Sequence, residues 1–166
     1  MLYLEEYLQT RIENASKVAI LGAGSVLKAD DAAGMLLIEK LEQLLGKDYP
    51  QVLLVAGSTA PENCTGVIKS FAPEHLFIVD AALLEEEPGV IGVIEPEQIK
   101  AISFSTHMLP FPIMVDYLQK QMDCPVSIIG IQPKSTRMED NLCDEVLSSV
   151  DELVQVFGQL FKKYFG

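Results

Sequence analysis

Short apolar blocks alternate along this chain with segments whose apolar residues recur at helical spacing. Continuous apolar runs are typical of buried strands, and they occupy residues 18–21, 52–55, 76–79 and 126–131, with weaker strand patterns at 90–95 and 101–106. Helical patterns occupy residues 2–14, 31–45, 62–70, 110–122 and 143–164. This alternation predicts a three-layer α/β fold, in which helices cover both faces of a mostly parallel, twisted sheet.

The length of 166 residues suits one domain. We expect a single α/β domain over 1–166, with residues 1–16 forming an N-terminal helix that precedes the core. No apolar run approaches the roughly 20 residues of a membrane helix, and the N-terminus lacks the basic start and apolar centre of a signal peptide. These features predict a cytoplasmic protein, and a monomer is the default expectation.

The formal net charge of −12 narrows the range of partners. Phosphate backbones and anionic membranes repel such a surface, so we expect neither nucleic acid nor membrane as a partner. Acidity also keeps a protein soluble, and a basic protein partner stays open. Cys64, Cys124 and Cys143 are far apart and form no Cys-x-x-Cys pair, so we expect small buried side chains and not nucleophiles.

Polar residues that suit a metal site follow three of the predicted strands. Asp30 and Asp31 end the loop after the first strand, Asp80 directly follows the third, and His107 follows residues 101–106. Ligands of open α/β sheets bind beyond the carboxyl ends of the strands. Two carboxylates and one imidazole suit nickel, zinc or iron(II), and three protein ligands leave positions open for water or substrate.

Each of these residues also has a structural interpretation. Asp30 or Asp31 could cap the helix that follows, Asp80 could fix its own loop, and His107 could be a hydrogen-bonded structural histidine. The other histidine, His75, precedes a strand at the opposite rim from Asp80 and is expected to be a surface or hinge residue. The convergence of three segments on one rim strengthens the case for a metal site, and position alone leaves the structural interpretations open.

A nucleotide-binding interpretation starts from Gly22-Ala23-Gly24. These residues follow a strand, as in a dinucleotide fingerprint, but Leu27 stands where the third glycine is required. The next helix also begins too late to place its N-terminus at a pyrophosphate. A nucleotide-binding regulator is therefore the least favoured function.

Five segments, in order along the chain, carry recognisable motifs: Leu21–Gly34, Gly57–Asn63, Leu76–Ala81, Ser105–Pro110 and Ile129–Pro133. Together they resemble a known family, the maturation endopeptidases of [NiFe] hydrogenases. They resemble the family's acidic-pair loop, the segment after its second strand, its central strand with an acid, its Thr-His motif and the strand before its last helix. The second and fifth look closest to the branch serving formate-hydrogenlyase-type hydrogenases.

The resemblance implies a function and a set of site residues. The family removes a C-terminal extension from the nickel-loaded large-subunit precursor of a [NiFe] hydrogenase, and it is grouped with aspartic-type peptidases. Its metal-contacting positions fall on Asp31, Asp80 and His107, which would be both catalytic and metal-binding here. Nickel would be supplied by the precursor, and other divalent ions could substitute. Of the acidic pair, Asp31 is then the expected ligand and Asp30 the expected cap.

The chain departs from the family pattern at several positions. Ser25 stands where the family usually has asparagine, and Ala32 where it usually has glycine; the segment between Pro133 and Leu142 lacks aromatic and glycine residues often found there. Ala56 stands where an aspartate usually follows the second strand. The missing acid leaves two hypotheses: an endopeptidase, which could be slow, or a non-cleaving paralogue that binds a hydrogenase precursor as a chaperone or recognition module.

Overall fold

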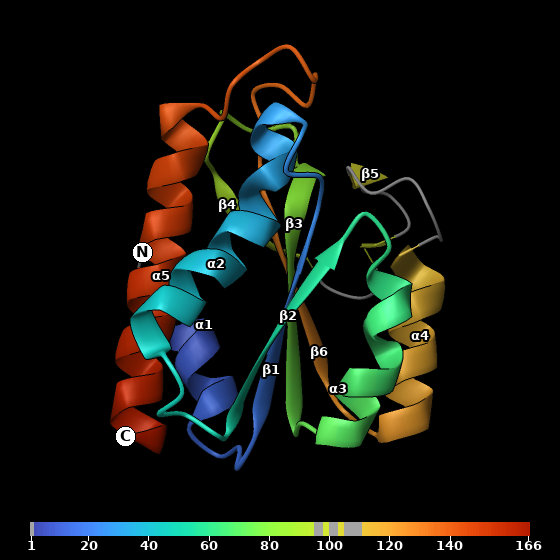
Figure 1. Cartoon of the computed structure of the whole chain (residues 1–166), viewed down its shortest axis with the longest axis vertical. Coiled ribbons are helices and arrows are strands. Elements are labelled where there is room, and N and C mark those ends of the chain that lie inside the picture. Colours follow the sequence, from blue (N-terminus) through green and yellow to red (C-terminus); the bar gives the residue numbers. More distant parts are fainter. Residues whose placement is uncertain (1, 95–97, 100–102, 105–110) are drawn as a thin grey trace.

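The chain folds around one twisted sheet (Figure 1). The structure is a computed structural model that describes residues 2–94, 98–99, 103–104 and 111–166. Its strands are β1 (Val18–Ala23), β2 (Val52–Ser58), β3 (His75–Leu83), β4 (Ile91–Ile94), β5 (Ser103–Phe104) and β6 (Val126–Ile131). The strand order is β2-β1-β3-β6-β4, and β5 pairs with β3 outside that order. β2, β1, β3 and β6 run parallel, whereas β4 is antiparallel to β6 and β5 to β3.

Helices cover both faces of the sheet, as the alternating pattern predicts. On one side lie α1 (Leu2–Ile12), α2 (Ala33–Leu45) and α5 (Asp144–Phe165), and on the other lie α3 (Thr65–Phe71) and α4 (Phe111–Met122). Two short 3-10 helices, η1 (Ala29–Ala32) and η2 (Pro61–Cys64), precede α2 and α3. The three-layer α/β prediction is confirmed. None of the helices in the described part of the chain is long and apolar enough to cross a bilayer.

Alternate residues of the central strands supply the two cores. Val18 and Ile20 of β1 join the cluster under α1, α2 and α5, while Ala19 and Leu21 join the cluster under α3 and α4. This follows from the period of two along a strand. Because both faces of β1 are covered, all of its residues are buried, which explains why its sequence is continuously apolar.

The predicted elements agree with the structure within a few residues, with one difference that affects the site. β3 does not end at Asp80 but continues to Leu83. Asp80 and Ala81 still pair with β6, opposite Gly130 and Ile131, and the last two residues pair with β5. The prediction that Asp80 follows the strand was wrong, because small apolar residues after an acid can continue a strand when a neighbour supplies ladder bonds.

His75 lies at the first position of β3, near the opposite end of the strand from Asp80, and its side chain is 6% exposed. Its Nε2 atom lies 2.8 Å from the Ser127 hydroxyl oxygen, which is itself 3.0 Å from the Tyr7 hydroxyl oxygen. Burial, with a smaller contribution from the nearby Arg11 charge, lowers the pKa of His75 to about 4. The interpretation of His75 as a surface residue was wrong, because the ring fills space between α1 and the sheet.

The pKa of His75 predicts an acid-induced loss of stability. At pH 7 the ring is neutral in both states; below the ordinary pKa of about 6.5 the unfolded chain takes up a proton that the folded chain excludes. The free energy of unfolding should therefore fall as the pH drops from about 6.5 to 4, by on the order of 2 kcal/mol from this group. Urea unfolding of wild type and His75→Gln across this range measures it. Parallel pH profiles for the two proteins would contradict the prediction.

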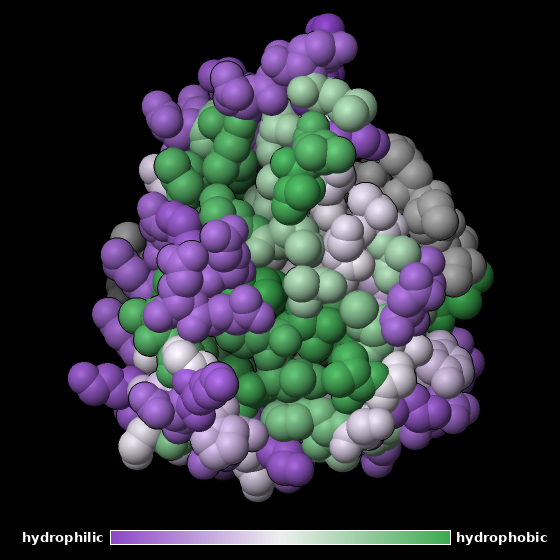
Figure 2. Space-filling model, viewed as in Figure 1, coloured by the Kyte–Doolittle hydropathy of each residue, from purple (hydrophilic) through white to green (hydrophobic). Residues whose placement is uncertain are grey.

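β2 forms one edge of the sheet and lies at the front of the view in Figure 1. Its residues Val52, Leu53 and Leu54 are only half-buried. Figure 2 shows apolar side chains gathered along the middle of this face, with hydrophilic side chains beside them over α2. The sheet thus presents an apolar edge to solvent on this side.

Candidate functional site

The candidate site lies at the carboxyl ends of the parallel strands. Gly22 of β1 pairs with Val79 of β3, so Asp80 lies just beyond the level at which β1 ends its pairing with β3. The chain leaves β1, forms η1, and in η1 contacts β3 again. Asp31 on η1 and Asp80 on β3 therefore lie on neighbouring elements at one rim, as strand-end reasoning predicts.

Asp31 is a buried carboxylate that is only half satisfied. It is 2% exposed, and its Oδ2 atom accepts a hydrogen bond from the Ser25 backbone N–H at 3.0 Å. Its Oδ1 atom is buried, and no hydrogen-bond donor among the described residues contacts it. A buried acceptor without a donor is destabilising by about 1–3 kcal/mol. Such an atom is typical of a functional site, where a ligand completes the bonding.

Two glycines allow η1 to sit directly on the strand ends. Gly24 has a φ of +121°, and a Cβ there would lie 1.8 Å from the Asp31 carbonyl oxygen. A Cβ on Gly34 would lie 2.3 Å from the carbonyl oxygens of both Ala23 and Val79. Any side chain at either position would push Asp31 away from the sheet, which explains the glycines on both sides of the acidic pair.

Asp30 is also buried, but both of its carboxylate oxygens accept hydrogen bonds from backbone N–H groups. Its Oδ2 atom accepts hydrogen bonds from the backbone N–H groups of Lys134 at 2.8 Å and Ser135 at 3.0 Å. Its Oδ1 atom accepts one from the Cys143 N–H at 2.7 Å, at the residue preceding α5. Asp30 therefore holds the loop between β6 and α5 against η1.

The prediction that Asp30 caps the helix after it was wrong. The N-cap of α2 is Ala32, and no side chain bonds the helix N-terminus there. The 3-10 turn of η1 shifts the helix start beyond both acids, so neither carboxylate reaches the first turn of α2. Asp30 is thus a structural residue, but it holds the loop before α5 and not the N-terminus of α2.

Asp80 is fully buried within β3. The Ala81 backbone N–H lies 2.8 Å from its Oδ1 atom and donates a hydrogen bond to it. His107, the third predicted ligand, lies outside the described residues. Among the residues that the structure describes, no three His, Cys, Asp or Glu side chains are grouped as a metal site would require. The structure therefore brings Asp31 and Asp80 to one rim and leaves the three-ligand set as a prediction.

The three cysteines do not supply a nucleophile. Burial raises the pKa of the Cys124 thiol to about 11, and it raises the pKa of Cys64 and of Cys143 as well. Only the thiolate is strongly nucleophilic, so these side chains stay protonated and unreactive at neutral pH. The low reactivity agrees with the expectation, whereas only Cys124 is fully buried and Cys64 and Cys143 are half-buried.

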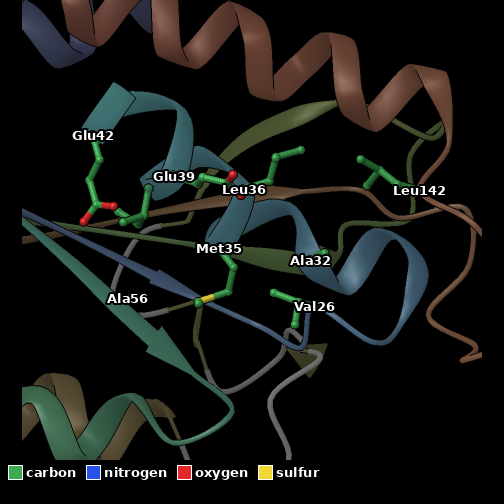
Figure 3. A pocket seen from close by; sticks show the side chains of 9 residues that line it. Val26, Ala32, Met35, Leu36, Glu39, Glu42, Ala56 and Leu142 are labelled. Atoms are coloured by element: carbon green, nitrogen blue, oxygen red, sulfur yellow. The ribbon is translucent and has the colours of Figure 1, made fainter. Parts of the chain in front are cut away.

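A cavity of about 300 Å³ lies between α2, β2 and the loop after β1 (Figure 3). Its lining residues come from the loop after β1, from α2, from β2 and from the segment before α5: Val26, Ala32, Met35, Leu36, Ile38, Glu39, Glu42, Ala56 and Leu142. Met35 lies at helical spacing with the buried residues Ile38, Leu41 and Leu45, which predicts a place in the apolar stripe that packs on the sheet. It is half-buried instead, and the Ser58 N–H donates to its sulfur at 3.2 Å. Sequence reasoning missed this cavity, because helical spacing does not distinguish a core position from a groove position at the edge of a sheet.

Comparison with known proteins agrees with this architecture. A family model described as HycI, hydrogenase maturation protease, matches residues 35–159, which is more than half of the chain. The chain belongs to the hydrogenase maturation protease family. The matched residues include Asp80 and His107, whereas Asp31 lies just before them.

Individual members of the hydrogenase maturation protease family are similar over most of their length. A putative hydrogenase maturation protease of Methanocaldococcus jannaschii is 33% identical over 165 residues, which cover 96% of this chain and 97% of that protein. The hydrogenase 3 maturation protease of Escherichia coli K12 is 33% identical over 115 residues, which cover 69% of this chain and 71% of that protein. The crystal structure of HycI from Thermococcus kodakarensis KOD1 superposes with a TM-score of 0.84 at 28% identity. The superposition covers 94% of this chain and 99% of that chain.

These similarities confirm the resemblance derived from the five motifs. The similarity to a hydrogenase 3 maturation protease is compatible with the branch serving formate-hydrogenlyase-type hydrogenases. The relatives are named as proteases or endopeptidases, which favours a peptidase over a non-cleaving binding module.

Proposed function

We propose that this protein is an endopeptidase that removes the C-terminal extension from the large-subunit precursor of a [NiFe] hydrogenase after nickel has been inserted. The observation that carries the proposal is the buried Oδ1 atom of Asp31, which no described donor contacts, on an element that packs against the strand of Asp80. A carboxylate held in this state is ready to accept a ligand from outside the chain. Nickel in the precursor would be that ligand, and would act as the recognition element of the substrate.

Asp31, Asp80 and His107 are the proposed contacts to the precursor's nickel. Two carboxylates and an imidazole match the ligands that nickel accepts, and other divalent ions could replace it. Because the precursor would supply some of the nickel ligands itself, the free enzyme would not need to hold a complete set of ligands. Recognition of the metal would restrict cleavage to precursors that already carry it.

The peptide-bond step follows from the available carboxylates. A carboxylate accepts a proton from water while the water oxygen attacks the scissile carbonyl carbon. The tetrahedral intermediate then collapses, the C–N bond breaks, and the leaving amine takes up the proton. This chemistry would place the enzyme with the aspartic-type peptidases, since the cysteine thiols stay protonated.

Cleavage of a purified precursor tests the proposal. We expect the protein to shorten the nickel-loaded precursor, with the loss of the C-terminal extension measured by mass spectrometry, and to leave the nickel-free precursor intact. Binding without any cleavage of the loaded precursor would overturn the endopeptidase proposal in favour of a recognition module. Equal cleavage of both precursors would overturn nickel recognition.

Ala56 offers a test of the missing acid. Its side chain is exposed and lines the cavity between α2 and β2, so Ala56→Asp should change the free energy of unfolding by less than about 0.5 kcal/mol. Relatives usually have an aspartate at this position, so we expect the added carboxylate to raise kcat about tenfold, below the full range of general-base effects. Steady-state cleavage of loaded precursor measures this, with Thr59→Asp as the control that adds the same charge at an exposed position absent from the cavity lining. An unchanged kcat would show that the missing acid does not limit this enzyme.

A further inference from the structure

The cavity lined by Met35 and Ala56 has the shape of a groove between α2 and the edge of the sheet. Met35, Glu39 and Glu42 lie at i, i+4 and i+7 along α2, a spacing that places them on one flank of the helix. On the other wall, Ala56 continues the row of Val52 and Leu54, which pack toward α2. Figure 3 shows the Met35 thioether between Ala56 and Val26, with both glutamates farther along α2.

The groove adjoins the candidate site through the chain itself. Ala32 in its lining directly follows Asp31, and Val26 directly follows Ser25, whose N–H binds the Asp31 carboxylate. Val26 is 66% exposed and Leu27 is 68% exposed. Val26 thus continues the apolar lining of the groove into the loop that holds the Asp31 carboxylate.

The edge of the sheet beside the groove can accept an extended chain. β1 is the only strand in the described part of the structure that pairs with β2. The other edge of Val52–Ser58 therefore lacks a strand partner there. Extended peptides commonly bind such edges by adding a strand, with pockets for alternate side chains providing selectivity.

The charges of the groove specify the substrate further. Glu39 and Glu42 are both exposed, and neither takes part in an ion pair with any described residue. Glu39 accepts one hydrogen bond, from the Gln43 side chain at 3.3 Å. Both carboxylates lie at the end of an otherwise apolar groove, and neither has a described cation beside it. They favour a substrate that carries a positive charge close to an apolar side chain.

We propose that this groove binds the C-terminal extension of the precursor as an extended segment. An apolar side chain of the extension occupies the cavity formed by Val26, Met35 and Ala56, and a lysine or arginine pairs with Glu39 and Glu42. The inference rests on the proposed endopeptidase function and adds the residues that select the segment to be removed.

Kinetics of a double variant tests the groove. Glu39→Gln with Glu42→Gln removes both charges while keeping the side-chain shape, and we expect KM for the nickel-loaded precursor to rise about 3–10-fold with kcat unchanged, as for partly exposed ion pairs. A matched control, Glu5→Gln with Glu6→Gln, removes two exposed charges from α1 and should leave KM unchanged. A precursor whose extension has Gln in place of every Lys and Arg should show the raised KM with wild type and no further rise with the double variant.

The apolar part of the groove has its own test. Ala56→Leu fills the cavity at an exposed position, so the protein should keep its melting temperature while KM rises about fivefold or more, as expected when an apolar side chain loses its pocket. The groove proposal would be overturned if both variants kept the KM of wild type, or if the natural extension contained no Lys or Arg. In either case, cleavage by wild type would still support the proposed function. Absence of cleavage by wild type would instead overturn the proposed function.

Discussion

Replacement of Asp31 by asparagine should abolish most of the cleavage activity while leaving the protein at least as stable as wild type. In the proposed function Asp31 binds the precursor's nickel or accepts a proton, and an uncharged amide would do neither, so we expect the cleavage rate to fall by about 10²–10⁴-fold. The side-chain oxygen of the introduced asparagine can still accept the Ser25 N–H bond. Because Oδ1 of Asp31 has no described donor, the substitution removes an unsatisfied buried charge, and stability should stay constant or rise by up to about 1 kcal/mol.

Two measurements on the same Asp31→Asn protein check this prediction. Cleavage of nickel-loaded precursor gives the activity, and urea unfolding at pH 7 gives the free energy of unfolding. A variant that unfolds more easily than wild type would show that Asp31 has a structural role. A stable variant that cleaves at the wild-type rate would remove Asp31 from the site.

Substitution of the neighbouring acid, Asp30→Asn, should affect mainly the stability of the protein and not its chemistry. Asp30 accepts three backbone hydrogen bonds, from Lys134, Ser135 and Cys143, and an amide group can keep the acceptor for only part of them. Its nitrogen would face at least one N–H group in a buried site. We expect a loss of about 2–3 kcal/mol for Asp30→Asn and about 3–5 kcal/mol for Asp30→Ala, since hydrogen bonds to a charged acceptor are individually strong.

Hydrogen exchange locates this loss within the protein. The amides of Lys134, Ser135 and Cys143 should exchange faster in Asp30→Asn than in wild type, because their shared acceptor is weakened, while the amides of β1 should report only the change in global stability. Unchanged exchange at these three positions would contradict the role of Asp30 as the anchor of this loop. The two adjacent acids thus form a matched pair, in which one substitution affects chemistry and the other affects stability.

Much of the fold was predictable because a strand that is buried on both faces has a continuous apolar sequence. The continuous apolar runs of β1 and β6 and the 3.6-residue spacing of α5 follow from burial alone, and their predicted positions agree with the structure to within two residues. The end of β3 was not predictable, because the residues after Asp80 are held in the sheet by ladder bonds to β6 and β5. Those bonds depend on partners distant in the sequence.

The sequence by itself determined the order of strands and helices along the chain and the arrival of Asp31 and Asp80 at the same rim, since both follow from local pattern and from the parallel direction of the strands. Only the tertiary structure distinguished the two adjacent acids. The β6–α5 loop supplies three donors to Asp30, and no described segment supplies one to the free oxygen of Asp31. Hydrogen bonds between segments more than a hundred residues apart make that difference, and no local pattern records them. The groove of Met35, Glu39 and Ala56 arises in the same way, from the packing of α2 beside an open strand edge.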